Sequence, residues 1–320
     1  MRGSTRGHAP GKIILFGEHA VVYGRPALAI PLNDLQATVT AKPGAAGQGV
    51  VIEAGDVGQR FSLRDSPAEP LAVAARLTLE HLGVAEPDVI LHIASAIPIA
   101  SGLGSGAAVS TALARALAAT LGQTIPPEAL SPLIYEAEKG YHGTPSGIDN
   151  TVVVYGQPVY FRRNDPHPPV IETFHTGAPV HLLIADTGVA SPTKVTVGDV
   201  RKGWQAQPTA YELTFDLIGG LVERARQAIE EGDRPTLGPL MNQNQELLRR
   251  LEVSSPEVEA LVGAALDAGA AGAKLSGGGR GGNVIALTDP ANRPYVTSAL
   301  KEAGATSVLE TTLRPASAPS

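Results

Sequence analysis

The spacing of apolar residues predicts a first half in which short strands precede a group of helices. Apolar, often β-branched runs bounded by Gly or Pro predict strands over 12–16, 21–23, 37–40, 49–53, 59–63 and 89–93. The sequence Gly17-Glu18-His19 is expected to form a bend between the first two strands. Helical spacing predicts helices over 71–82, 107–121 and 127–141, and a further apolar strand is expected at 152–154.

The pattern changes after residue 160. The segment 162–169 is polar and rich in proline, which the interior of a strand or helix accepts poorly. We therefore predict a boundary here, with domains over 1–165 and 166–320. Beyond it the pattern predicts strands over 180–185, 284–287 and 306–310, a polar loop over 186–194, and helices over 209–231, 234–251, 255–268 and 294–303. This βααβαβ-like alternation favours an α+β sandwich.

Composition narrows the class of protein. A chain of 320 residues with 43% hydrophobic content can bury a sizeable core, and its length suggests about two domains. The net charge of −6 gives no electrostatic footprint for nucleic acid. The absence of Cys excludes disulfides and thiolate metal sites. No apolar run approaches membrane-spanning length and none follows the N-terminal charges as in a signal peptide, so a cytoplasmic protein without a membrane partner is expected.

Three glycine-containing stretches hold the candidate chemistry. The stretch 11–20 contains Lys12, the stretch 100–108 is a glycine turn before a predicted helix, and the stretch 142–150 contains Asp149. Glycines let backbone N–H groups approach an anion closely, and a following helix presents its positive end to that anion. A lysine, a phosphate-sized turn and a carboxylate are the parts that phosphoryl transfer requires.

Some of these residues also fit different kinds of site, or no site. The pattern at 102–107 matches the dinucleotide fingerprint, but no second strand ending in an acidic residue follows. The glycines at 277–282 spell a protein-kinase loop without the other kinase motifs, and the Walker sequence is absent. In a purely structural role, Ser105 would merely cap a helix, and Lys12 and Glu138 would be solvated surface charges.

Taken together, these stretches resemble the mevalonate kinases of the GHMP kinase superfamily, over essentially the whole chain. The string 10–24 is most similar to the mevalonate kinase version, because phosphomevalonate kinases typically have tyrosine where His19 stands. The stretch 98–108 resembles the superfamily's phosphate loop, with Gly106 in place of its second serine. The stretch 273–282 resembles its C-terminal glycine motif, with Gly278 where alanine is common and Arg280 where glycine is usual.

The resemblance implies a two-domain α+β fold, with an N-terminal domain like domain 2 of ribosomal protein S5 and a C-terminal ferredoxin-like α/β sandwich. It implies ATP-dependent phosphorylation of mevalonate to 5-phosphomevalonate, in the mevalonate pathway of isoprenoid biosynthesis, with Mg²⁺ as cofactor. Asp149 would be the catalytic base with Lys12 beside it, and Ser105 and Glu138 would hold the metal. The expected nucleotide contacts are Pro98, Ala100, Ser101, Gly102, Leu103, Gly104, Ser105, Gly106 and Ala107. The expected mevalonate contacts are Glu18, His19, Ser146 and Thr193, with Lys194 as a partner for the carboxylate.

Elementary chemistry agrees with these roles. A hydroxyl is a poor nucleophile at neutral pH, so a carboxylate such as Asp149 must accept its proton while a cation such as Lys12 offsets the developing charge. In a loose transition state Asp149 mainly orients the hydroxyl. Two alternatives stay open: a sister kinase for another alcohol, in which Arg280 would face a phosphorylated acceptor, and a metabolite sensor without catalysis. The resemblance also leaves a homodimer open.

Overall fold

The computed structural model describes residues 4–55, 58–99, 101–142, 145–191 and 193–315. The chain forms two compact units that do not follow its linear order. Unit 1 contains residues 1–12 and 31–156, and unit 2 contains residues 13–30 and 157–320. The domain split between residues 165 and 166 therefore stays a prediction, since these units follow contacts and place 13–30 with the second half.

Unit 1 is built on a mixed β-sheet, which contains both antiparallel and parallel strand pairs. Its strands are β1 (Thr5–Phe16), β2 (Ala27–Pro43), β3 (Val50–Ala54), β4 (Gln59–Ser62) and β5 (Val89–Ser95), of which β1 and β2 continue into unit 2. The order is β4-β3-β5-β2, and β1 pairs with β2. Strands β3 and β5 run parallel, whereas β2 pairs with β5 in antiparallel register from Ala37↔Ser95 to Pro43↔Val89. Alternate apolar residues of these strands form one side of the core.

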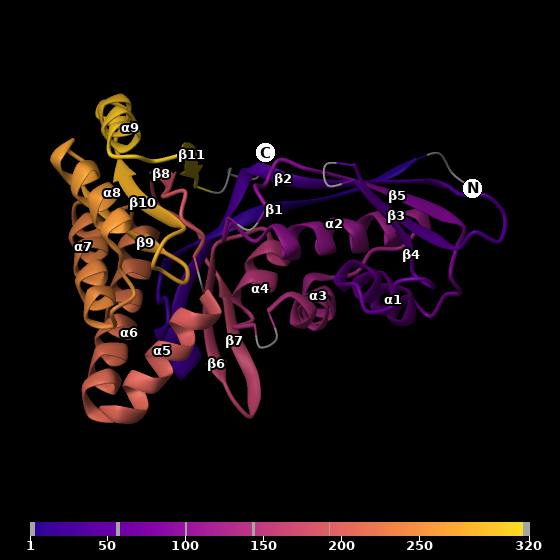
Figure 1. The fold of residues 1–320 in the computed structure, drawn as a ribbon, viewed down its shortest axis with the longest axis horizontal. Helices are drawn as coiled ribbons and strands as arrows, with labels where there is room; N and C mark the ends of the chain where they lie inside the picture. Colours follow the sequence, from indigo (N-terminus) through magenta and orange to yellow (C-terminus); the bar gives the residue numbers. More distant parts are fainter. Residues whose placement is uncertain (1–3, 56–57, 100, 143–144, 192, 316–320) are drawn as a thin grey trace. The chain divides into compact units, whose positions relative to one another are not determined.

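Four helices pack on one side of this sheet (Figure 1). They are α1 (Pro70–Leu82), α2 (Ser105–Thr120), α3 (Pro127–His142) and α4 (Ile148–Tyr155). Helix α2 is almost entirely buried and rich in alanine, which permits close approach. Gly7 of β1 meets it so closely that an ideal Cβ there would lie 2.1 Å from the carbonyl oxygen of Ala112. This contact fixes the strand that contains Lys12 against the helix that follows the glycine turn.

Unit 2 contains a hairpin and a second sheet. The hairpin strands β6 (Val159–Asn164) and β7 (His167–Thr173) pair with each other, and β6 also pairs with the start of β2. The second sheet is antiparallel, in the order β11-β8-β10-β9, with strands β8 (Val180–Asp186), β9 (Gly272–Ser276), β10 (Asn283–Thr288) and β11 (Ser307–Leu313). Its helices are α5 (Thr193–Ala206), α6 (Pro208–Glu231), α7 (Arg234–Arg250), α8 (Pro256–Asp267) and α9 (Arg293–Glu302).

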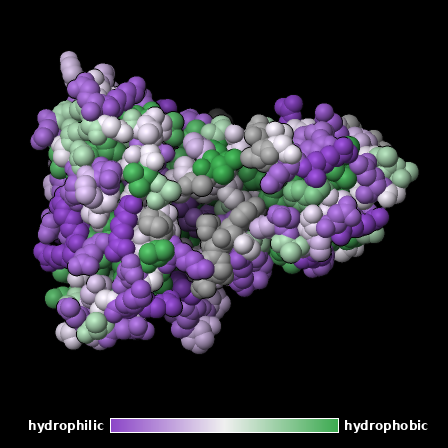
Figure 2. Space-filling model, viewed as in Figure 1, coloured by the Kyte–Doolittle hydropathy of each residue, from purple (hydrophilic) through white to green (hydrophobic). Residues whose placement is uncertain are grey.

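The helices of unit 2 complete an α/β sandwich. Helix α6 packs against α7 and helix α8 packs against α9 (Figure 1), and both α7 and α8 pack on β9. Figure 2 shows hydrophilic side chains over most of the visible helical surface of this unit, with apolar residues scattered among them. Helix α6, for example, buries Phe215 and Ile218 but leaves Leu217 half exposed. This division between apolar and polar faces is the amphipathic pattern from which the helices were predicted.

Three sequence predictions are wrong. Residues 162–169 form most of the β6–β7 hairpin, because in the described structure β7 pairs only with β6 and an edge strand tolerates Pro168 and Pro169. The expected strand at 21–23 is a 3-10 turn (Ala20–Tyr23) that ends at Gly24. The expected strand at 152–154 belongs to α4, since three apolar residues cannot distinguish strand from helix. Helix α5 and strand β9 were not predicted.

Candidate active site

Lys12 and Asp149, the two predicted catalytic residues, form an ion pair in unit 1. Lys12 lies on β1, is 4% exposed, and places its Nζ 2.9 Å from Oδ1 of Asp149. The Asp149 side chain is 30% exposed, so its carboxylate is partly accessible while the lysine is not. The interpretation of Lys12 as a solvated lysine at the end of a strand is therefore wrong. A buried ammonium beside an accessible carboxylate can hold that carboxylate in one orientation.

Helix α4, which contains Asp149, is fixed at its first turn. Gly147 caps the helix with a φ of 91°, a left-handed conformation that favours glycine. The predicted acceptor residue Ser146 accepts a hydrogen bond at Oγ from the backbone N–H of Ile148, at 3.4 Å. Asn150 donates from Nδ2 to both the carbonyl oxygen and Oγ of Ser131 on α3, at 3.1 and 2.9 Å. The carboxylate of Asp149 thus sits in the first turn of a helix bonded to α3.

Glu138 lies on α3, two helical turns after Ser131. It is 2% exposed, so its interpretation as an exposed carboxylate is wrong. The pKa of Glu138 is raised to about 8, mainly by burial and also by the negative charge of Asp149, while the charge of Lys12 opposes the shift. Two carboxylates therefore share one lysine in this cluster. When both are ionised the cluster has a surplus negative charge, which favours a bound cation.

The glycine turn lies directly against Lys12. The backbone N–H of Lys12 donates to the carbonyl oxygen of Leu103 at 2.9 Å. An ideal Cβ on Gly104 would lie only 2.7 Å from Cγ of Lys12, and Gly104 also has a φ of 76°. Gly104 is the N-cap of α2, so Ser105 is the first helical residue and not the cap. The expected nucleotide contact Ala100 lies outside the described residues.

Arg115 connects the three elements that hold these groups, and no sequence motif points to it. From α2 it donates to the carbonyl oxygen of His8 on β1 and to that of Val154 on α4, each at 2.7 Å. The first bond is to the strand of Lys12 and the second is to the last turn of the helix of Asp149. A guanidinium at a helix C-terminus also interacts favourably with the helix dipole. No local pattern marks one arginine in an alanine-rich helix as having this position.

Three of the four predicted acceptor residues, Glu18, His19 and Thr193, belong to unit 2, whereas Ser146 belongs to unit 1. Glu18 is completely buried and forms an ion pair with Lys274 of β9, a residue for which the sequence predicted no role. The turn that contains Glu18 begins at Gly17, where an ideal Cβ would lie 2.5 Å from the Cα of Ala27. The turn is therefore packed tightly against the start of β2.

The imidazole of His19 is held in one protonation state. Its Nε2 lies 3.1 Å from the carbonyl oxygen of Gly278, and since a carbonyl only accepts, Nε2 must hold the proton. The pKa of His19 is lowered to about 4, mainly by burial; the bond to Gly278 opposes this shift, and the charge of Arg280 adds to it. At neutral pH the ring is uncharged. Its Nδ1 is then a hydrogen-bond acceptor.

Gly278 lies between two of the predicted acceptor residues. Its carbonyl oxygen accepts from His19, and an ideal Cβ on it would lie 2.5 Å from Oγ1 of Thr193. Thr193 begins α5 and is exposed, as is Lys194 after it. Ser191 donates to the carbonyl oxygen of Gly279 at 2.8 Å and so joins this loop to the start of α5. Glycine at 278 is thus a steric requirement of the contact with Thr193.

Arg280 already has partners. Its guanidinium pairs with Asp199 of α5 at 2.7 Å and donates from Nε to the carbonyl oxygen of Glu252 at 3.0 Å. Its φ of 53° lies in the left-handed region, which favours glycine. The arginine connects the glycine loop to α5 and to the end of α7. This arrangement leaves it poorly disposed to bind a phosphorylated acceptor.

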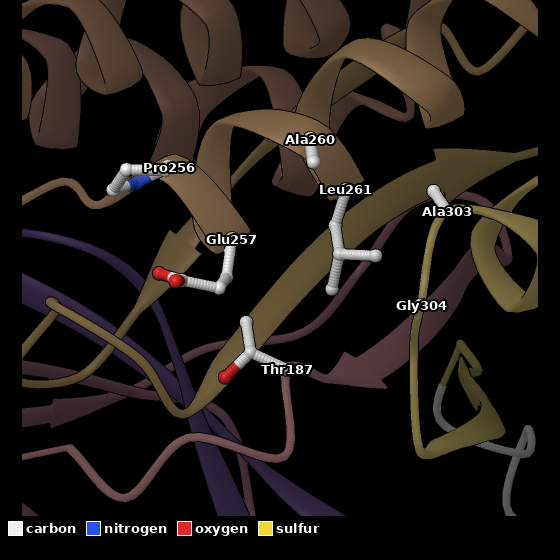
Figure 3. A pocket seen from close by; sticks show the side chains of 7 residues that line it. All are labelled: Thr187, Pro256, Glu257, Ala260, Leu261, Ala303 and Gly304. Atoms are coloured by element: carbon white, nitrogen blue, oxygen red, sulfur yellow. The ribbon is translucent and has the colours of Figure 1, made fainter.

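A surface cavity of about 320 Å³ lies elsewhere in unit 2, and Figure 3 shows Glu257 and Thr187 at its wall. None of the predicted site residues lines it.

Among the described residues, no three His, Asp or Glu side chains gather as metal ligands. A search of the same residues finds no helix long and apolar enough to span a membrane.

Comparison with known proteins gives one consistent assignment. The family model of the GHMP kinases N terminal domain matches residues 70–157, and that of the GHMP kinases C terminal matches residues 225–306. The mevalonate kinase of Thermococcus sibiricus is 36% identical over 318 residues, 92% of each chain. That of Aeropyrum pernix is 37% identical over 90% of this chain and 89% of its own. A crystal structure of L. major mevalonate kinase in complex with R-mevalonate superposes with a TM-score of 0.85 and 31% identity, over 99% of this chain and 98% of the other. By sequence and by fold, the chain belongs to the mevalonate kinase family within the GHMP kinases, a family of ATP-dependent small-molecule kinases.

Proposed function

We propose that this protein transfers the γ-phosphoryl group of ATP to the 5-hydroxyl of mevalonate, the step that forms 5-phosphomevalonate in isoprenoid biosynthesis. The observation that supports this most directly is the ion pair between Lys12 and Asp149 beside the glycine turn, in a chain whose relatives are mevalonate kinases. A cytoplasmic location and assembly as a homodimer stay predictions.

Asp149 receives the proton of the acceptor hydroxyl in this proposal. Its partly exposed carboxylate can meet a substrate, and the buried Lys12 holds it in place. The ammonium of Lys12 also offsets the negative charge that grows on the attacking oxygen. The phosphates of ATP lie at the glycine turn, where the first N–H groups of α2 and its positive end favour anions. In a loose transition state, positioning of the hydroxyl by Asp149 contributes more than early proton removal.

Mg²⁺ is the expected metal, and the residues present fit it. The hydroxyl of Ser105 and the carboxylate of Glu138 are oxygen donors, the kind that Mg²⁺ prefers, and phosphate oxygens and water complete such a site. The raised pKa of Glu138 beside Asp149 supports a cluster that gains from a cation. When bound, the ion would neutralise negative charge on the phosphate groups of ATP.

The acceptor would bind where unit 2 presents His19 and Thr193. Neutral His19 offers Nδ1 to a hydroxyl donor, because Nε2 is bonded to Gly278. Thr193 adds an exposed hydroxyl that can donate or accept. Lys194, exposed beside it, supplies a positive charge for the carboxylate of mevalonate. Glu18 acts from behind this surface, since it is fully buried.

A substrate panel tests the proposal. ADP release from MgATP is measured with mevalonate, 5-phosphomevalonate, homoserine and galactose offered separately. Mevalonate is expected to exceed every other acceptor by about 100-fold in kcat/KM or more, because unpaired polar groups in a site reject the wrong ligand strongly. Preference for 5-phosphomevalonate would assign a sister kinase and require Arg280 to leave Asp199. Tight binding of any acceptor without ADP release would instead indicate a sensor.

A further inference from the structure

We propose that Lys274 is a positioning residue of the acceptor site, which fixes Glu18 and through it the turn that presents His19. The inference rests on the proposed function, since it assigns His19 to the binding of mevalonate. Lys274 is 0% exposed, lies on β9 and cannot meet a ligand itself. Its effect must therefore pass through the residues that it contacts.

Strand β9 and the loop after it contact the segment 14–19 at every second residue. Lys274 pairs with the carboxylate of Glu18, and Oγ of Ser276 donates to the carbonyl oxygen of Ile14 at 2.7 Å. Gly278, two residues further, accepts from His19. Alternate residues of a strand face the same side, so Lys274 and Ser276 share one face of β9, and Gly278 in the loop after the strand completes a row of three contacts. The row sets the position of the segment 14–19 relative to the glycine loop.

The turn that contains His19 needs such support. His19 has a φ of 61° and a ψ of −48°, a backbone conformation that a residue with a side chain rarely adopts. Strained conformations persist where the surrounding structure holds them in place. Two side chains of this turn are anchored to the β9 segment, Glu18 by Lys274 and His19 by Gly278. Loss of one anchor would let the backbone relax and move the imidazole.

Stability alone is a weak reason for this ion pair. Two charges lose their hydration on burial, and well-packed apolar residues often serve as well as a buried pair. The surroundings of Lys274 add a bond from Nζ to the carbonyl oxygen of Leu275 and the ring of Phe16, whose centroid is 6.0 Å away. The lysine is thus bonded on more than one side, which fixes the direction in which it holds Glu18. We infer that geometry is what the pair provides.

Kinetics of paired variants test the inference. Lys274→Met is expected to raise KM for mevalonate about tenfold, because a displaced His19 loses its bond to the acceptor, and to leave KM for ATP within about twofold. Glu18→Gln should have a similar effect. If Lys274 acts through Glu18, adding Lys274→Met to Glu18→Gln changes KM by less than about twofold. Effects that multiply in the double variant would overturn the proposal.

A matched control separates positioning from loss of stability. Gln245 of α7 is buried, and its Oε1 accepts from the backbone N–H of Leu275 on the same strand. Gln245→Leu should lower Tm without raising KM for mevalonate. If Lys274→Met behaves like this control, the role of Lys274 is structural and the proposal is wrong. Where Lys274→Met fails to fold, the comparison of Glu18→Gln with Gln245→Leu decides in the same way.

A readout without substrate keeps this inference separate from the proposed function. Inactivity of the wild-type protein on mevalonate would refute the proposed function only. Nitrogen-15 spectra of the histidine rings report which nitrogen holds the proton. The wild-type spectrum should show His19 with the proton on Nε2, and Lys274→Met should shift this signal while Gln245→Leu leaves it unchanged. An unshifted His19 signal in Lys274→Met would overturn the positioning role, whatever the substrate.

Discussion

Nζ of Lys12 lies 2.9 Å from Oδ1 of Asp149, although 137 positions separate the two residues in the sequence. The lysine is also bonded through its backbone to Leu103 of the glycine turn. One residue of β1 therefore fixes the distance between the turn and the carboxylate. In the proposed function, that distance relates the phosphate site to the carboxylate that receives the proton of the acceptor hydroxyl.

Asp149→Asn should lower kcat about 100-fold or more, because an amide cannot accept the hydroxyl proton. KM for ATP should change little, since the glycine turn is untouched. Steady-state ADP release measures both. Asp34→Asn is the control, as Asp34 is exposed on β2 outside the site. An Asp149→Asn enzyme that keeps a tenth of the wild-type kcat would exclude Asp149 as the base and leave it an orienting role.

Gly104→Ala should lower kcat/KM by about 100-fold, because small displacements of a catalytic group have effects of this size. The new Cβ would lie 2.7 Å from Cγ of Lys12, so the lysine or the turn must move. Gly122→Ala is a matched control at the other end of α2. Gly122 has a similar left-handed φ of 71°, but its ideal Cβ meets nothing within 4 Å.

Both substitutions introduce backbone strain of about 1 kcal/mol, which urea unfolding measures, but only Gly104→Ala meets the lysine. Equal loss of activity in the two variants would show that strain at the ends of α2, and not the contact with Lys12, impairs the enzyme.

The raised pKa of Glu138 predicts how the free energy of unfolding of the nucleotide-free protein depends on pH. The pKa of Glu138 is about 8 in the folded protein and 4.5 in the reference state, so between these values only the folded protein holds this proton. The stabilisation linked to the proton is complete below pH 4.5 and is lost as pH rises through 8. Each pKa unit corresponds to about 1.4 kcal/mol.

Urea unfolding from pH 5 to 9 should therefore show a steeper loss of stability for the wild type than for Glu138→Gln. Glu136→Gln provides the control, because Glu136 lies on the same helix, is exposed and pairs with Lys139. Parallel curves for wild type and Glu138→Gln would mean that the carboxyl of Glu138 titrates normally and that the cluster does not require a cation.

The sequence predicted the parts with strong local signals. Helices that end at glycine were placed well: the helix predicted over 71–82 is α1 (Pro70–Leu82), and Gly83 caps it. The motif residues Lys12, Glu138 and Asp149, predicted as one site, lie together in unit 1. Their chemical roles stay predictions, which the variants above test.

Residues whose partners are distant in sequence could not be predicted. Arg115 and Lys274 have no neighbouring residues that mark them, since the partners that define their roles, His8, Val154 and Glu18, lie 39 to 256 positions away. The local pattern also predicted a strand over 152–154, where Asp149 lies in the first turn of a helix, because this run is too short to reveal its period. Position 278 requires glycine because Thr193 packs against it. The two residues are distant in sequence, so this requirement could not be predicted.

His19 predicts a second pH dependence, of opposite sign. The pKa of His19 is about 4 in the folded protein against 6.5 ordinarily, so between these values the unfolded chain binds a proton that the folded protein does not. The stabilisation linked to neutral His19 is complete above pH 6.5 and is lost as pH falls through 4. The free energy of unfolding of the wild type should fall by about 1.4 kcal/mol for each pH unit over this window.

His19→Gln removes the titrating ring and keeps an amide donor for Gly278, so its stability should fall less between pH 6.5 and 4 in urea unfolding. His167→Gln, on the exposed edge strand β7, should follow the wild type. If His19→Gln follows the wild type instead, the ring is not held neutral by burial, and Nδ1 is not reserved as an acceptor. The same variant should also weaken mevalonate binding at pH 7, because the amide oxygen, which is the acceptor left in glutamine, does not occupy the position of the imidazole Nδ1.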